Sequence, residues 1–216
     1  MASLRALLGV VLCSLMVSAS EILPQADFDL QGIAGKWYLT GTCSNSKWFV
    51  CRKANMKSGT AVAEPTEDGS LKATFSFLTD PCWKIEILAS KTDVPGKFTY
   101  TIPFTGFATE MRVVDAKPDE YSLNHYINTG RNGTFVENNL YGRSLDLSDE
   151  VKEKFNQLCL QSGILPENIV YLPKTDLICN ECPQATWNSS WIPAVGLQQG
   201  LGDDSEKFKQ HGTSHS

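Results

Sequence analysis

Several features that mark other classes of protein are missing from this chain of 216 residues. The one marked apolar run, Ala6–Val17, is too short to cross a bilayer, which takes about 20 apolar residues, and no other run is longer. No basic stripe stands out, and 19 basic residues against 24 acidic ones leave a net charge of −5. We therefore expect no membrane span and no nucleic-acid partner.

A metal site or another cofactor is not expected either. Cys179 and Cys182 form a C-x-x-C pair, but a zinc site needs a second such pair or nearby histidines, and neither is present. His211 and His215 lie in residues 183–216, which are rich in Gly, Gln, Ser and Asp and have no apolar periodicity. That composition is typical of a disordered tail.

Residues 1–20 have the pattern of a secretory signal peptide. Arg5 is their only charged residue, the apolar run follows it, and Ser18-Ala19-Ser20 supply the small residues of a cleavage site. We therefore predict a secreted, extracellular protein with one folded domain, residues 21–182. Disulfides form readily in that environment.

Short apolar segments separated by turn residues fill the chain from Gly35 to Gly142. The predicted strands are Lys36–Gly41, Lys53–Ala63, Ser70–Phe77, Trp83–Ala89, Lys97–Thr101, Phe107–Val114, Tyr121–Asn128 and Thr134–Gly142. Regular spacing with such turns is typical of antiparallel sheets. The sequence thus predicts an all-β fold, an eight-stranded up-and-down barrel wide enough for side chains or one small ligand.

One helix is predicted after the barrel. Ser148 suits its N-cap and Gly163 its C-terminal end. The residues at helical spacing on its apolar face are Val151, Phe155, Leu158 and Cys159. This face should pack on the outside of the barrel, with Cys159 as a buried free thiol. A short strand, Asn168–Leu172, follows.

Two motifs at the ends of this region resemble those of the lipocalin family. Gly35-Lys36-Trp37 matches the G-x-W of the first strand, and Leu140-Tyr141-Gly142-Arg143 matches the closing motif after the eighth. The resemblance covers Gln31 to Cys182. It implies that Trp37 plugs the closed end of the barrel and that Arg143 covers it through a cation–π contact. It also implies a monomeric carrier that transports or sequesters a small hydrophobic molecule of the fatty acid, retinoid, prostaglandin or steroid class.

Three segments resemble the prostaglandin D synthase subgroup of lipocalins: 44–48, 65–69 and 74–78. In those enzymes a nucleophilic cysteine lies eleven residues after a loop tryptophan. Counting from Trp48, that position is Gly59, which has no thiol. We therefore expect no catalytic residue and no enzyme. An isomerase of this kind, and a defence lipocalin that captures siderophores or toxins, are the alternatives.

The resemblance also suggests disulfides. Cys82 matches one member of the family's usual bridge, with Cys179 preferred over Cys182 as its partner. Cys43 and Cys51 flank the first long loop, and three arrangements compete. In the first, which we prefer, the two pair with each other. In the second, Cys43 is an exposed reactive thiol, as in α1-microglobulin-like lipocalins, and in the third, one of them pairs with Cys182.

Strand alternation, combined with the resemblance, predicts which residues meet the ligand. They are Leu39, Trp48, Lys57, Gly59, Thr74, Ser76, Ile85, Ile87, Met111, Val113, Asn139 and Tyr141. On the seventh strand, either the Tyr121, Leu123 and His125 set or the Asn124 and Tyr126 set faces inward.

Lys57 is the one basic group predicted to face inward, and it should reach water, meet an anion or pair with Glu137. Apolar walls with scattered polar groups fit an amphipathic ligand with an acidic or hydroxyl head. Separately, Asn132-Gly133-Thr134 and Asn188-Ser189-Ser190 are acceptor sequences that predict N-glycosylation of Asn132 and Asn188.

Overall fold

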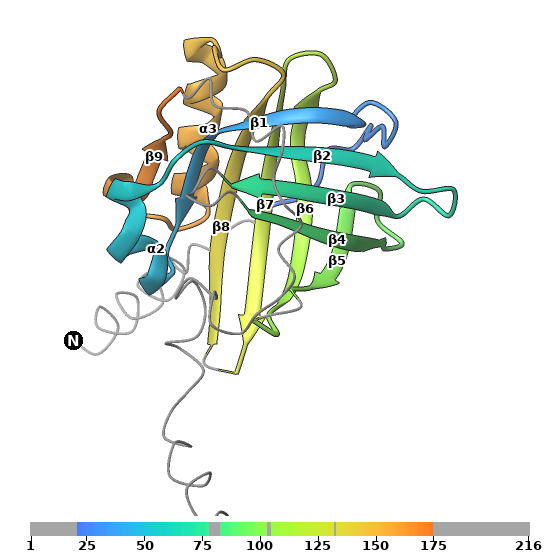
Figure 1. The fold of residues 1–216 in the computed structure, drawn as a ribbon, viewed down its shortest axis with the longest axis horizontal. Coiled ribbons are helices and arrows are strands. Elements are labelled where there is room, and N and C mark those ends of the chain that lie inside the picture. Colours follow the sequence, from blue (N-terminus) through green and yellow to red (C-terminus); the bar gives the residue numbers. More distant parts are fainter. Residues whose placement is uncertain (1–20, 78–82, 103–104, 132, 175–216) are drawn as a thin grey trace, which may run out of the picture.

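The computed structural model describes residues 21–77, 83–102, 105–131 and 133–174 (Figure 1). The predicted signal peptide and tail, the predicted bridge from Cys82 to Cys179 or Cys182, and both glycosylation sites, Asn132 and Asn188, lie outside these residues.

Eight antiparallel strands form a closed barrel (Figure 1). They are β1 (Gly35–Ser44), β2 (Gly59–Pro65), β3 (Leu71–Phe77), β4 (Trp83–Lys91), β5 (Lys97–Thr101), β6 (Ala108–Lys117), β7 (Tyr121–Gly130) and β8 (Gly133–Gly142). Each strand pairs with the next, and β1 pairs with both β2 and β8, which closes the sheet. A ninth strand, β9 (Ile169–Tyr171), pairs with the second half of β1. The predicted barrel is confirmed.

The segment between β1 and β2 differs from the prediction. The predicted strand Lys53–Ala63 is wrong in its first half: α2 (Lys47–Arg52) leads into the 3₁₀ helix η1 (Lys53–Asn55), and β2 begins only at Gly59. The Ser46 hydroxyl accepts a hydrogen bond from the Phe49 amide at 3.2 Å and so caps α2. Phe49 is only 2 % exposed and anchors the helix.

The helix after the barrel, α3 (Asp149–Gln161), begins at the predicted cap: the Ser148 hydroxyl accepts from the Val151 amide at 3.3 Å. Gly163 follows it with a φ of 75°, which L-residues with side chains rarely adopt. A second 3₁₀ helix, η2 (Pro166–Asn168), leads into β9. None of the described helices is both long and apolar enough to span a bilayer.

Two separate cores hold this architecture together. The first lies inside the barrel and includes Trp37, Leu39 and Phe98. The second lies between α3 and the outer surface of β1, β7 and β8, and includes Phe155, which is fully buried. A Cβ atom on Gly41 would lie 3.0 Å from the Phe155 ring, so this glycine lets the helix approach β1 closely.

Candidate functional site

Trp37 closes one end of the barrel. Its side chain is 4 % exposed, and its indole Nε1 donates a hydrogen bond to the Ile33 carbonyl at 2.8 Å. The Arg143 guanidinium carbon lies 3.6 Å from the centre of the Trp37 ring, which is the predicted cation–π contact. The same guanidinium donates to four backbone carbonyls, those of Gly32, Ala34, Lys36 and Pro118. We call this the Trp37 end of the barrel.

Strand register identifies the inner face of the barrel, because residues paired across antiparallel strands point to the same side. The predicted ligand residues that lie on this face are Leu39, Gly59, Ile85, Ile87, Met111, Val113, Asn139 and Tyr141. All except Ile85 are buried. On β7 the open question is resolved in favour of Asn124 and Tyr126, whereas Leu123 packs in the outer core.

The prediction for β3 is wrong. Thr74 pairs with Glu86 and Ser76 with Lys84, two charged residues on the outer surface of the sheet. The inner positions of β3 belong instead to Leu71, Ala73 and Phe75, which belong to the barrel interior. Burying these apolar side chains is favourable, and the two-residue period of the strand then forces the hydroxyls outward.

Lys57 is also placed differently from the prediction. It is exposed and lies between η1 and β2, before the strand that was expected to turn it inward. Among the described residues, no ion pair joins it to Glu137. Trp48 lies half-buried on α2, and its indole Nε1 has no hydrogen-bond partner in the described part of the chain. The inner face thus lacks the basic group that the sequence suggested.

Polar side chains from β7 and β8 gather on the inner face: Asn124 and Tyr126 also line the cavity next to Trp37, whereas Glu137 lies at the opposite end. The Asn139 Nδ2 donates to Glu137 Oε1 at 2.9 Å. The Asn124 Nδ2 donates to the Tyr126 hydroxyl at 3.3 Å. Glu137 pairs in register with both Tyr126 and Ser44, the last residue of β1. We call this end, where α2 follows β1, the α2 end of the barrel.

These groups have shifted pKa values. Burial raises the pKa of the Glu137 carboxyl, although the hydrogen bond from Asn139 opposes the shift. Burial also raises the pKa of Tyr126 to about 12 and that of Tyr100 and Tyr141 well above the usual value, and the Glu137 charge contributes to each rise. The three tyrosines therefore stay neutral and offer hydroxyl groups, while Glu137 is the group near them that can carry charge.

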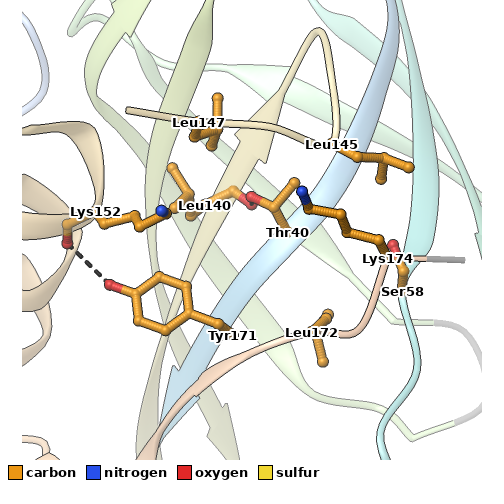
Figure 2. A pocket seen from close by; sticks show the side chains of 9 residues that line it. All are labelled: Thr40, Ser58, Leu140, Leu145, Leu147, Lys152, Tyr171, Leu172 and Lys174. Atoms are coloured by element: carbon orange, nitrogen blue, oxygen red, sulfur yellow. Dashed lines mark hydrogen bonds between the residues drawn. The ribbon is translucent and has the colours of Figure 1, made fainter. Parts of the chain in front are cut away.

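The space inside the barrel is small at the Trp37 end. A cavity of about 40 Å³ lies between Trp37, Phe75, Met111 and Tyr126. A larger one of about 270 Å³ lies outside the barrel, between β1, α3 and the β9 segment (Figure 2). Several leucines line it, and Lys152 and Lys174 lie at it, each already paired with an aspartate. The outer cavity is therefore separate from the inner face.

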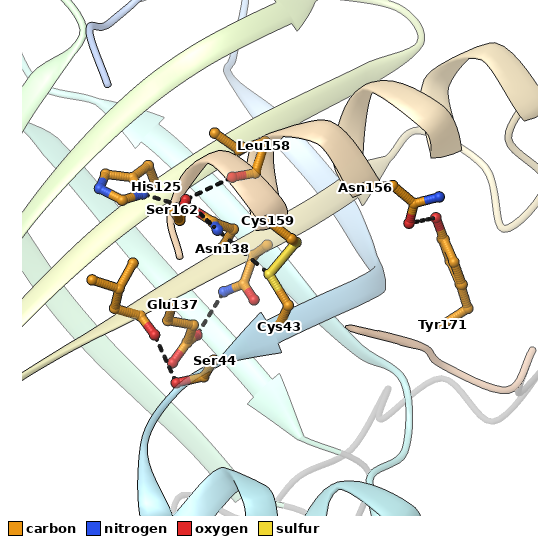
Figure 3. Close-up of a disulfide and its surroundings, with 12 residues drawn as sticks. Cys43, Ser44, His125, Glu137, Asn138, Asn156, Leu158, Cys159, Ser162 and Tyr171 are labelled. Atoms are coloured by element: carbon orange, nitrogen blue, oxygen red, sulfur yellow. Dashed lines mark hydrogen bonds between the residues drawn. A yellow bond between two sulfur atoms is a disulfide. The ribbon is translucent and has the colours of Figure 1, made fainter. Parts of the chain in front are cut away.

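Cys43 and Cys159 form a disulfide, 116 residues apart in the sequence, that joins β1 to α3 (Figure 3). The predicted loop bridge between Cys43 and Cys51 is therefore wrong, as are a reactive Cys43 thiol and a free thiol at Cys159. Cys51 is an exposed free thiol on α2. The physical reason is a β-bulge between Leu39 and Gly41, which reverses the alternation of β1 and turns Cys43 outward to the helix.

A buried polar network surrounds this disulfide (Figure 3). The Asn138 Nδ2 donates to Cys43 Sγ at 3.4 Å and to the Ser162 hydroxyl at 2.9 Å. Its Oδ1 lies 2.7 Å from His125 Nδ1. Burial lowers the pKa of His125, and the nearby Arg112 charge adds to this effect, although the bond to Asn138 opposes it. These groups belong to the outer core rather than to the inner face.

Some inner-face residues were missed at the sequence level. Phe75 and Phe98 were detectable, since each alternates with polar neighbours on its strand. Tyr100 also alternates with polar neighbours on its strand, and it was not predicted to face inward either. Glu137 was considered only as a partner for Lys57, because a carboxylate facing the interior of a barrel has no signal in the sequence that separates it from an outward one.

Comparison with known proteins agrees with this architecture. Residues 34–176 match the model of the lipocalin / cytosolic fatty-acid binding protein family. A lipocalin of Rhinella marina is 39 % identical over 181 residues, which cover 80 % of this chain and 98 % of the relative. Prostaglandin-H2 D-isomerase of Mus musculus is 34 % identical over 189 residues, covering 84 % and 100 %. A structure of the siderocalin Ex-FABP aligns with a TM-score of 0.59 at 25 % identity, covering 67 % and 95 %.

Proposed function

This chain belongs to the lipocalin family, whose members bind small hydrophobic ligands, and from that premise we propose that it is a secreted carrier. It transports or sequesters a small hydrophobic molecule inside the barrel, with a body like that of a fatty acid, retinoid, prostaglandin or steroid. The carrier acts as a monomer without a cofactor. Residues 1–20 are its signal peptide, residues 21–182 its barrel domain, and residues 183–216 a flexible tail.

The observation that carries this proposal is the polar content of the inner face. A barrel interior that served only as a core would leave few buried polar groups without partners, since each costs about 1–3 kcal/mol. Here Asn139 is 6 % exposed, yet its Oδ1 has no hydrogen-bond partner among the described residues. Apolar walls with a few such placed groups are typical of ligand sites. The small cavity at the Trp37 end favours a ligand held toward the α2 end.

We propose that the chain does not share the isomerase activity named for its murine relative. Gly59, at the position where resemblance expects a nucleophile, is buried on the inner face beside Leu39 and Phe77. A Cβ atom there would lie 2.8 Å from the Ser76 carbonyl oxygen, so even an introduced cysteine would force the strands apart. Cys43 is held in the disulfide, which leaves Cys51 on α2 as the described free thiol.

Siderophore capture, suggested by the name of the structural neighbour, has less support. Anionic chelates call for inward basic groups, and Lys57 was the candidate for that role. Its exposed position outside the strands removes it from the inner face.

Native mass spectrometry tests the carrier function. Protein secreted from animal cells should carry a stoichiometric small molecule that organic solvent releases. Thr42→Phe fills the interior from β1 beside Asn139, whereas Thr60→Phe adds the same ring on the outer face of β2. We expect the first variant to lose the ligand and the second to keep it, with circular dichroism as the check on folding. Equal ligand content in the two folded variants would refute binding inside the barrel.

An assay with prostaglandin H2 and a thiol cofactor tests the alternative function. We expect no turnover above the uncatalysed rate. Turnover that Cys51→Ala abolishes would show that the chain is an isomerase acting from α2.

A further inference from the structure

Glu137 stands out on the inner face because of its charge. Among inner-face positions of the described strands it is the single charged residue, apart from Lys91, which lies exposed at the end of β4. It is placed inward by its register with Tyr126, a member of the barrel core. The described ion pairs of the protein do not include it, whereas the outward Glu86 and Glu110 are both paired with lysines. A carboxylate held in a partly dry site without a counter-charge is unfavourable.

Asn139 adds a second acceptor beside this carboxylate. The Nδ2 of Asn139 donates a hydrogen bond to Glu137 Oε1. The Oδ1 of the same side chain therefore points away from that bond. That Oδ1 is buried and has no partner in the described part of the chain. The pair therefore presents acceptors on two side chains that are neighbours on one face of β8, and within the described residues the Asn139 Nδ2 is the one donor bonded to either of them.

Taken with the proposed carrier function, on which this step rests, we infer that the barrel selects ligands whose polar head is an amine. The Glu137 carboxylate and the Asn139 Oδ1 receive the head, and the apolar body lies among the aromatic side chains toward the Trp37 end. A primary ammonium carries three donors and a positive charge, which is the complement of this pair. The rings of Tyr126 and Tyr141, both buried in the interior, add cation–π attraction.

The same geometry disfavours ligands with a carboxylate head, such as fatty acids. Such a head would place a second negative charge close to Glu137, and the inner face offers no lysine or arginine near that residue to offset it. A neutral alcohol can donate one hydrogen bond and should fall between the two. The sequence had predicted a ligand with an acidic head, because Lys57 was expected to face inward. The structure favours the opposite, because Lys57 lies outside the barrel and Glu137 lies inside it.

Three probes of equal chain length separate these head groups: decylamine, decanol and decanoic acid. Their dissociation constants are measured at pH 8 by tryptophan fluorescence and by calorimetry, below the concentrations at which they form micelles. We expect the amine to bind wild-type protein at least about tenfold more tightly than the acid, since the ammonium forms charge-assisted hydrogen bonds with this pair whereas a carboxylate head is repelled by Glu137. Glu137→Gln should remove this preference while leaving the affinity for decanol within about twofold.

Glu86→Gln is the matched control, because it removes the same charge from the outer face of β4. It should keep the preference for the amine. If decanol binds but the acid binds wild-type protein as tightly as the amine, the carrier function stands and the amine inference is refuted. If none of the probes binds, the carrier function itself fails. The ranking on wild-type protein decides the inference even if Glu137→Gln does not fold.

Discussion

Removing the Cys43–Cys159 bridge should lower the stability of this domain substantially. The double variant Cys43→Ala, Cys159→Ala keeps both positions apolar, as their complete burial requires. In the chain-entropy relation, a crosslink between residues 116 apart restricts the unfolded chain by about 5 kcal/mol at 25 °C. Loss of native disulfides from small secreted domains typically costs about 2–5 kcal/mol. We therefore expect a loss near the upper end of that range.

Urea unfolding followed by tryptophan fluorescence measures this loss, with wild-type protein and the double variant compared under non-reducing conditions. Cys51→Ala is the control, since Cys51 is exposed and free, and it should change the free energy of unfolding by less than about 0.5 kcal/mol. Peptide mapping without reduction should recover residues 43 and 159 in one linked fragment. A fragment that links Cys43 to Cys51, together with a large loss of stability in Cys51→Ala, would refute the Cys43–Cys159 bridge in favour of a Cys43–Cys51 bridge.

Three further predictions concern the rest of the chain. Trp37→Ala should lower the free energy of unfolding by about 3–5 kcal/mol, as for other large buried aromatics; an unchanged melting temperature would contradict its role as a plug. Because burial holds the pKa of His125 below its usual value of 6.5 in the folded state, its contribution to stability is complete above that pH and is lost as the pH falls below it. His125→Gln should flatten this part of the stability profile between pH 7 and pH 5, and an unchanged slope would exclude His125 as its source. Glycosidase treatment of the secreted protein should remove mass from Asn132 and Asn188, and no loss of mass would show that neither site is occupied.

The sequence by itself determined the features that depend on neighbouring residues. Period-two alternation and turn residues were enough to predict eight strands, and the cap at Ser148 with Gly163 fixed the ends of α3. The Trp37–Arg143 contact followed from two motifs that the family keeps at the ends of the barrel. The strand and helix signals lie within a few residues, whereas the Trp37–Arg143 contact joins the two ends of the barrel region and was implied by the resemblance to the lipocalin family.

Only the tertiary structure decided which side chains face inward and which cysteines pair. Alternation shows which residues of one strand share a face, but not which of the two faces points into the barrel. That depends on which residues the adjacent strands bury, and for this reason Phe75 faces inward where Thr74 was predicted to do so. The β-bulge in β1 reverses the alternation of that strand, so that Cys43 points outward to α3 instead of into the barrel. Lys57 lies outside the barrel because α2 and η1 delay the start of β2 until Gly59, whereas the register of β8 with β7 places Glu137 on the inner face. The polar groups that face a ligand inside the barrel therefore depend on the register between strands, and this register is fixed only when the barrel closes.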